Sequence, residues 1–168
     1  MRIIHCTKRL LKEIEAVPIE FDRNVSALEG MGNWYANLIR IDRRKCIIFT
    51  NEKTLYTFLI PKVVKNNLKN IEHEFLTHLT FNLQSEGFGI EIIHRIQQEY
   101  REIRYAKTAN RSVLGSMNDL ASLYEHRIMG SGGIDNMKIL AINQETNRTP
   151  MGALKYVFPI KALKNLLQ

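Results

Sequence analysis

Three short runs rich in β-branched and aromatic residues follow one another in the chain, at residues 34–41, 45–50 and 54–60. Only short polar segments, 42–44 and 51–53, separate them. Breaks of this length connect neighbouring strands by hairpins and leave no room for a crossover. The spacing therefore predicts an antiparallel β-meander, around which the rest of the chain has to pack.

After residue 67 the hydrophobic period changes from that of a strand to that of a helix. Apolar residues at helical spacing predict a long amphipathic helix from residue 67 to Gly87. We also expect short strands at 1–5 and 102–107, and helices at 8–14, 90–100, 116–129, 135–146 and 160–168. The predicted fold class is α+β, an antiparallel β-meander packed with several α-helices. Because no linker rich in glycine, proline or serine interrupts the pattern, we predict one domain over residues 1–168.

The composition is that of an ordinary globular protein. Hydrophobic residues make up 45% of the 168 residues and charged residues 24%, which excludes disordered, collagen-like and coiled-coil chains. No apolar run is long enough to span a membrane, and the N-terminal residues do not resemble a signal peptide. The two cysteines, Cys6 and Cys46, form no metal or redox motif and fit a reducing compartment. We therefore expect a cytoplasmic protein.

Charge is distributed unevenly along the chain, whose formal net charge is +7. Residues 1–70 carry 13 basic and 7 acidic side chains, residues 71–100 carry 1 and 5, and residues 101–168 carry 10 and 5. The excess of basic residues in both flanks is compatible with simple solubility, or with a basic face that binds an anionic partner.

Known cofactor and metal motifs are not matched. Gly30-Met31-Gly32 lacks a third glycine and precedes a predicted strand, which excludes the dinucleotide-binding motif. His73 and His78 are five residues apart and would lie about 140° apart around a helix, which is unsuitable for a shared metal ion. We expect no metal and no cofactor.

A short sequence pattern occurs twice. Residues 110–117 and 147–154 share the order Asn-Arg-hydroxyl-x-apolar-Gly-small-apolar. In the second copy, Thr149-Pro150 is typical of a helix start, and Ser112 occupies the same place in the first. Two helix N-termini, each beside an arginine, would form an anion site. The predicted anion-binding residues here are Asn110, Arg111, Ser112, Asn147, Arg148 and Thr149. In the alternative interpretation, both segments are capped turns and each arginine bonds only to its own loop.

Arg43-Arg44-Lys45 is the densest cationic cluster and lies at a predicted hairpin. A solvated turn explains it, and so does a phosphate contact with Trp34, Tyr35 and Tyr56 on neighbouring strands as stacking surfaces. In the alternative interpretation, these three aromatic residues belong to the core. We include the three cations among the predicted anion-binding residues.

Three segments, ANLIRIDRRKC (36–46), AKTANRSVLGSMND (106–119) and NRTPMGALKY (147–156), resemble a bacterial family known only as a domain of unknown function. The similarity extends over nearly the whole chain. It implies a complete single domain, and it brings no activity, substrate or catalytic residue.

The residues support three functional hypotheses of different classes. The first is a binding module for a phosphate-bearing partner, either nucleic acid or a nucleotide. The second is an enzyme acting on a small anionic substrate, with Asp42, Asp119 or Cys46 transferring protons or attacking the substrate. The third is a protein-interaction module that uses the acidic helices of residues 71–100 against a basic partner. The sequence leaves the oligomeric state open.

Overall fold

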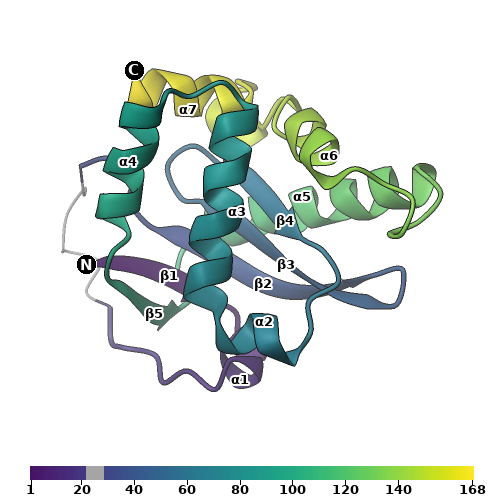
Figure 1. Ribbon diagram of the computed structural model, residues 1–168, viewed down its shortest axis with the longest axis horizontal. Coiled ribbons are helices and arrows are strands. Elements are labelled where there is room, and N and C mark those ends of the chain that lie inside the picture. Colours follow the sequence, from purple (N-terminus) through teal and green to yellow (C-terminus); the bar gives the residue numbers. More distant parts are fainter. Residues whose placement is uncertain (22–28) are drawn as a thin grey trace.

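Residues 34–60 form three strands of a five-stranded sheet in the computed structural model, which describes residues 1–21 and 29–168 (Figure 1). Strand β2 (Trp34–Ile41) pairs antiparallel with β3 (Arg44–Asn51), and β3 pairs antiparallel with β4 (Thr57–Ile60). The turn between β2 and β3 contains two residues, Asp42 and Arg43, because Arg44 already belongs to β3.

The sheet as a whole is mixed, which corrects the expectation of an antiparallel meander. Strand β1 (Arg2–Cys6) lies between β2 and β5 (Ile103–Lys107) and runs parallel to both, so the strand order is β4-β3-β2-β1-β5. A helix lies between β1 and β2 in the chain, and several helices lie between β4 and β5. Such crossovers bring the chain back in the same direction, whereas a hairpin reverses it.

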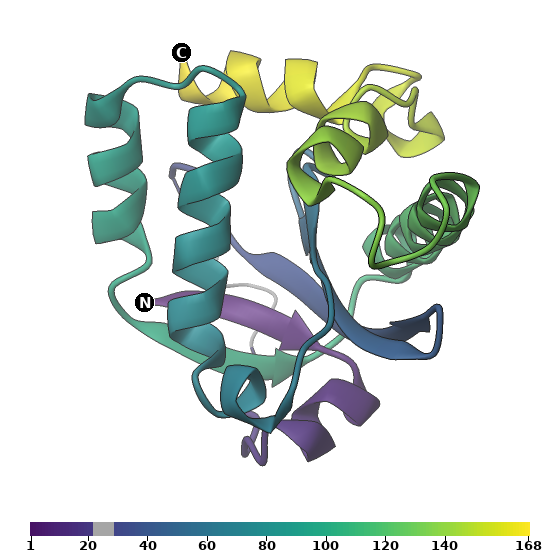
Figure 2. The same cartoon turned by 45° about the vertical axis from the view of Figure 1, so that its right-hand side comes forward.

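Helices pack on both faces of the sheet (Figure 2). Those of one face surround a core of aromatic rings in which Trp34, Phe49, Phe58 and Phe75 are fully buried. Helices α5 and α6 cover the opposite face and form a second core. The helices in the described parts of the chain are α1 (Lys8–Glu13), α2 (Lys65–Lys69), α3 (Ile71–Ser85), α4 (Ile90–Glu99), α5 (Arg111–Gly130), α6 (Ile139–Thr146), the 3-10 helix η1 (Gly152–Leu154) and α7 (Pro159–Leu167).

Several helix boundaries differ from those that the sequence predicts. The helix expected from residue 67 is divided at Asn70 into α2 and α3, and α6 begins at Ile139 instead of residue 135. Helix α5 begins at Arg111, five residues earlier than expected, because the side chain of Asn110 accepts hydrogen bonds from Ser112 N–H and Val113 N–H. The helix start expected at Thr149-Pro150 is wrong. Only the short helix η1 follows, and it ends where Lys155 and Tyr156 adopt left-handed conformations.

Candidate functional site

The turn between β2 and β3 holds two non-glycine residues in the left-handed region, Asp42 at φ 50° and Arg43 at φ 64°. Positive φ at both central residues is the geometry of tight hairpins, but it costs about 1 kcal/mol for each residue that has a Cβ. Asp42 Oδ2 accepts a hydrogen bond of 3.0 Å from Ile134 N–H. This contact ties the turn to the loop that follows α5.

A second contact of the same loop restrains the neighbouring cations. Asp135 Oδ1 lies 3.2 Å from Lys62 Nζ and 3.9 Å from Arg44 Nη1. The loop approaches closely because Gly133 has no side chain, and a Cβ at that position would lie 2.7 Å from Asp42 Oδ2. Asp42 therefore ties the turn to this loop, and Asp135 offsets part of the charge of the cations beside the turn.

Pairing of β2 with β3 places Arg40 directly opposite Lys45. Like charges at such positions repel each other and destabilise the strand pair. Lys45 Nζ is 3.4 Å from Glu13 Oε2, and the Lys45 carbonyl accepts from Val63 N–H at 2.8 Å. We use the name hairpin tip for the cations gathered by these contacts, which are Arg40, Arg43, Arg44, Lys45 and Lys62.

Asn110 to Ser112, from the first copy of the repeated pattern, lie at the start of α5. Asn110 N–H donates to Tyr35 Oη at 3.0 Å, and the Asn110 side chain caps the helix through Ser112 N–H and Val113 N–H. These two N–H groups are the donors that an anion at the helix N-terminus would use, and the cap already occupies them. Arg111 and Ser112 are exposed.

Asn147, from the second copy, is buried against strand β4. The Asn147 side-chain amide accepts from Thr57 N–H at 2.8 Å and donates to the Thr57 carbonyl at 2.7 Å. One turn earlier on α6, Asn143 Oδ1 accepts from Leu59 N–H at 3.1 Å. These two amides take the place of a neighbouring strand at this edge of the sheet.

The two residues that follow are also engaged inside the protein. Arg148 donates two hydrogen bonds to Glu86, of 2.7 and 3.1 Å. This paired arrangement compensates the Glu86 carboxylate for its burial. Thr149 Oγ1 accepts from Arg127 Nη2 at 3.4 Å. The structure therefore gives these side chains internal partners, and it does not place them at the N-terminus of a helix.

The fold brings the two copies to one end of the sheet but keeps them away from the hairpin tip. Tyr35, Thr50 and Thr57 lie opposite one another on β2, β3 and β4, so the partners of Asn110 and Asn147 are two strands apart. Helix α5 then runs from the Tyr35 end of β2 toward the loop that binds Asp42. The predicted anion-binding residues thus divide into three groups, and only Arg43, Arg44 and Lys45 belong to the hairpin tip.

Sequence reasoning missed two members of the hairpin tip. Arg40 joins it through the strand register, which follows once the turn is fixed at residues 42 and 43. Lys62 joins through Asp135, a contact between segments 73 residues apart that no local pattern indicates.

The groups considered for catalysis are dispersed. Cys46 is buried, and desolvation raises the pKa of its thiol. Asp42 bonds to Ile134 N–H, and Asp119 is exposed on α5. Across residues 1–21 and 29–168, no group of three or more histidine, cysteine, aspartate or glutamate side chains is arranged to hold a metal ion.

A protein-family model described as a domain of unknown function (DUF6933) matches residues 3–162. The chain belongs to this family. The match includes all three segments that resemble such a family in sequence, and it covers most of the first core and all of the second core of this DUF6933 member. No curated protein and no solved structure gives a significant match to it. In the described parts of this DUF6933 member, no helix combines the length and the apolar character needed to cross a membrane.

Proposed function

We propose that this DUF6933 member binds nucleic acid through the hairpin tip. The observation that carries the proposal is the concentration of cations on a fixed turn, with Arg40 placed opposite Lys45 in the strand register. Asp42 in the turn itself, together with Asp135 and Glu13, offsets part of this charge. Within the described residues, Arg40 and Arg43 are exposed and belong to no ion pair. A negatively charged partner would relieve the repulsion between these cations.

The rigidity of the turn supports the same proposal. Binding normally costs free energy because flexible side chains and loops must be ordered. Here the turn is already tied to the loop after α5 by the hydrogen bond from Ile134 N–H to Asp42. An anionic partner would meet arginine side chains that extend from an ordered backbone.

The position of the hairpin tip favours a nucleic acid over a free nucleotide. The turn lies at the periphery of the molecule (Figure 1). Two pockets lie next to β5, and none of the hairpin-tip cations lines either of them. A nucleotide is normally bound in a concave site, whereas a phosphate polymer needs only cations at a suitable spacing.

Fluorescence anisotropy with labelled oligonucleotides tests the proposal. The probes are a DNA duplex, a single-stranded DNA and a single-stranded RNA of about 20 nucleotides each, titrated between about 50 and 200 mM salt. The test variant is Arg40→Gln/Arg43→Gln. The matched control is Lys161→Gln/Lys164→Gln, which removes the same charge from α7 at a distance from the hairpin tip.

We expect at least one probe to bind the unmodified protein, with an affinity that falls steeply as salt rises. The test variant should weaken binding by about tenfold and lower the slope of log affinity against log salt by about 2, because each phosphate contact contributes about 0.9 for duplex DNA. The control should keep the slope. Absence of binding at low salt, an equal loss in the control, or binding of ATP with no binding of any oligonucleotide would overturn the proposal.

A further inference from the structure

The two edge strands of the sheet, β4 and β5, differ in how their outward backbone groups are hydrogen-bonded. At the β4 edge, the Asn143 and Asn147 amides bond to the outward backbone groups of Thr57 and Leu59. At the β5 edge, Ile19 N–H donates to the Tyr105 carbonyl at 2.8 Å. In the part of the chain that the structure describes, the main-chain pairing on the outer side of β5 consists of this contact and the parallel bridge between Ile19 and Ala106, both in the second half of the strand. An edge strand with open backbone groups is a template for another strand.

The strand register shows which backbone groups of β5 are open. Arg2 N–H donates to the Glu102 carbonyl at 2.9 Å, so the backbone groups of Glu102 face β1. Peptide groups alternate in direction along a strand, so those of Ile103 and Tyr105 face outward. The Ile19 contact to Tyr105 agrees with this alternation. Within residues 1–21 and 29–168, the Ile103 N–H and carbonyl and the Tyr105 N–H have no main-chain partner, and they can pair with a further strand.

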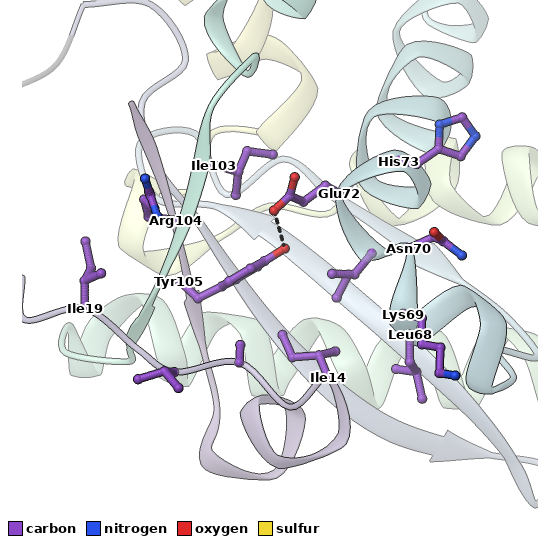
Figure 3. A pocket seen from close by; sticks show the side chains of 13 residues that line it. Ile14, Ile19, Leu68, Lys69, Asn70, Glu72, His73, Ile103, Arg104 and Tyr105 are labelled. Carbon is purple, nitrogen blue, oxygen red and sulfur yellow. Dashed lines mark hydrogen bonds between the residues drawn. The ribbon is translucent and has the colours of Figure 1, made fainter.

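A pocket of about 600 Å³ lies beside these open groups (Figure 3). Its apolar lining comes from Ile14, Ile19, Leu68, Ile71 and Ile103, which belong to four separate segments. This volume is in the range of pockets that hold several side chains or a small ligand. Val17, at its margin, is 88% exposed.

The charges around the pocket favour an acidic occupant. Lys69 and Arg104 are exposed at its rim, and Arg104 Nη2 lies 3.4 Å from Glu102 Oε1 in an ion pair that is itself exposed to solvent. The one acidic lining residue, Glu72, accepts a hydrogen bond of 3.2 Å from Tyr105 Oη, which directs its carboxylate toward the protein (Figure 3). Burial raises the pKa of Tyr105 above its usual range, so this hydroxyl remains a donor.

We propose that β5 and this pocket bind an extended acidic peptide of a partner protein by strand addition. The peptide backbone pairs with Ile103 and Tyr105, and an apolar side chain enters the pocket. Because side chains alternate between the two faces of a strand, a carboxylate two residues away meets Lys69 on the pocket side, and a carboxylate next to the apolar residue meets Arg104 on the opposite face. Main-chain hydrogen bonds supply affinity in this mode, and the pocket supplies specificity. The site is independent of the hairpin tip and of the nucleic-acid proposal.

Model peptides test this inference without disturbing the fold. The probes are Ac-Asp-Val-Ile-Glu-Val-NH₂, its charge-reversed form Ac-Lys-Val-Ile-Lys-Val-NH₂, and the acidic peptide N-methylated at alternate residues. Binding is followed by amide chemical shifts of the ¹⁵N-labelled protein and by hydrogen exchange of the Ile103 and Tyr105 amides. N-methylation removes backbone pairing and leaves the side chains unchanged.

We expect the acidic peptide to shift resonances of residues 103–105 and 69–73 and to slow exchange at both amides. The N-methylated and charge-reversed peptides should bind at least tenfold more weakly. Lys69→Glu/Arg104→Glu should reverse the charge preference, whereas Lys161→Glu/Lys164→Glu, with the same change in charge, should not.

Three outcomes would overturn the inference. The first is that none of the peptides binds, and the second is that shifts map away from β5 or that the N-methylated peptide binds equally well. The third is concentration-dependent dimerisation that protects Ile103 and Tyr105 in the protein alone, since the occupant would then be a second copy of the chain.

Discussion

Arg148 Nη2 lies 2.7 Å from Glu86 Oε2, and Arg148 Nη1 lies 3.1 Å from Glu86 Oε1. The Glu86 side chain is 1% exposed, whereas that of Arg148 is 43% exposed. The arginine therefore neutralises a buried carboxylate while it remains in contact with solvent.

Removal of Arg148 should destabilise the protein more than removal of the pair. Arg148→Met leaves the Glu86 carboxylate buried without its cation, and we expect a loss of about 2 kcal/mol in the free energy of unfolding. Glu86→Gln/Arg148→Met should recover at least half of that loss. Urea unfolding measures both variants, and an equal or larger loss in the double variant would contradict this account of the pair.

The two asparagines of the repeated pattern should differ in their contributions to stability. Asn147→Ala leaves Thr57 N–H and the Thr57 carbonyl without partners in the interior, which we expect to cost about 3 kcal/mol. Asn110→Ala removes an exposed helix cap and should cost about 1 kcal/mol. Thermal and urea unfolding compare them. Similar losses in the two variants would show that the roles are not those assigned here.

Acidification should weaken the fold through His5. This ring is buried, stacks on Tyr35 at 4.7 Å between centroids, and has Nδ1 2.9 Å from the Lys107 carbonyl. Burial lowers the pKa of His5 below its ordinary value of 6.5. The unfolded chain then binds a proton more readily than the folded chain, so stability falls as pH drops below that ordinary value.

The pH dependence is measured by urea unfolding at several pH values between about 7.5 and 5. Burial also lowers the pKa of His78, which lies 3.4 Å from Glu74, so part of the dependence belongs to that residue. His5→Gln should reduce the dependence of the unfolding free energy on pH, and adding His78→Gln to that variant should reduce it further. An unchanged slope in His5→Gln would refute the assignment.

The two thiols should be unreactive in the folded protein. Cys6 and Cys46 are fully buried, and burial raises the pKa of Cys6 to about 12. Because the thiolate is the reactive species, iodoacetamide should modify neither residue at neutral pH until the chain unfolds. Mass spectrometry after timed labelling, with and without urea, checks this. Rapid labelling of native Cys46 would reopen it as a candidate nucleophile.

Gly133 should tolerate no side chain. It has φ +100°, and an added Cβ would meet Asp42 Oδ2 at 2.7 Å. Gly133→Ala should therefore lower the free energy of unfolding by about 2 kcal/mol. Gly130→Ala is the control, since nothing lies within 4 Å of its Cβ position, and it should be neutral or slightly stabilising. Equal stability of the two variants would mean that the loop moves freely away from the turn.

Features set by local spacing could be predicted from the sequence. The strands of residues 34–60 and the helix ending near Gly87 follow from hydrophobic periodicity, and the structure contains them. Family membership was also expected and is confirmed. The place of β1 between β2 and β5 could not be predicted, because it depends on pairing between segments about 100 residues apart in the chain.

The candidate site shows the same division between local and distant effects. The Arg43-Arg44-Lys45 cluster is visible in the sequence, and a two-residue turn fixes its position. Asn147 and Arg148 resemble helix-start residues in the sequence. Their side chains instead form hydrogen bonds with Thr57 and Glu86, which are distant in sequence. A similar sequence pattern therefore performs a different task in each copy.

The location of β1 inside the sheet has a consequence for biosynthesis. This strand is synthesised before the other strands of the sheet, yet its two neighbours are residues 34–36 of β2 and the whole of β5. Until residue 107 has been translated, one side of β1 has no strand to pair with. The apolar residues Ile3 and Ile4 then belong to an incomplete sheet. Nascent chains of intermediate length should therefore depend most on chaperones, and the sheet should close late in co-translational folding.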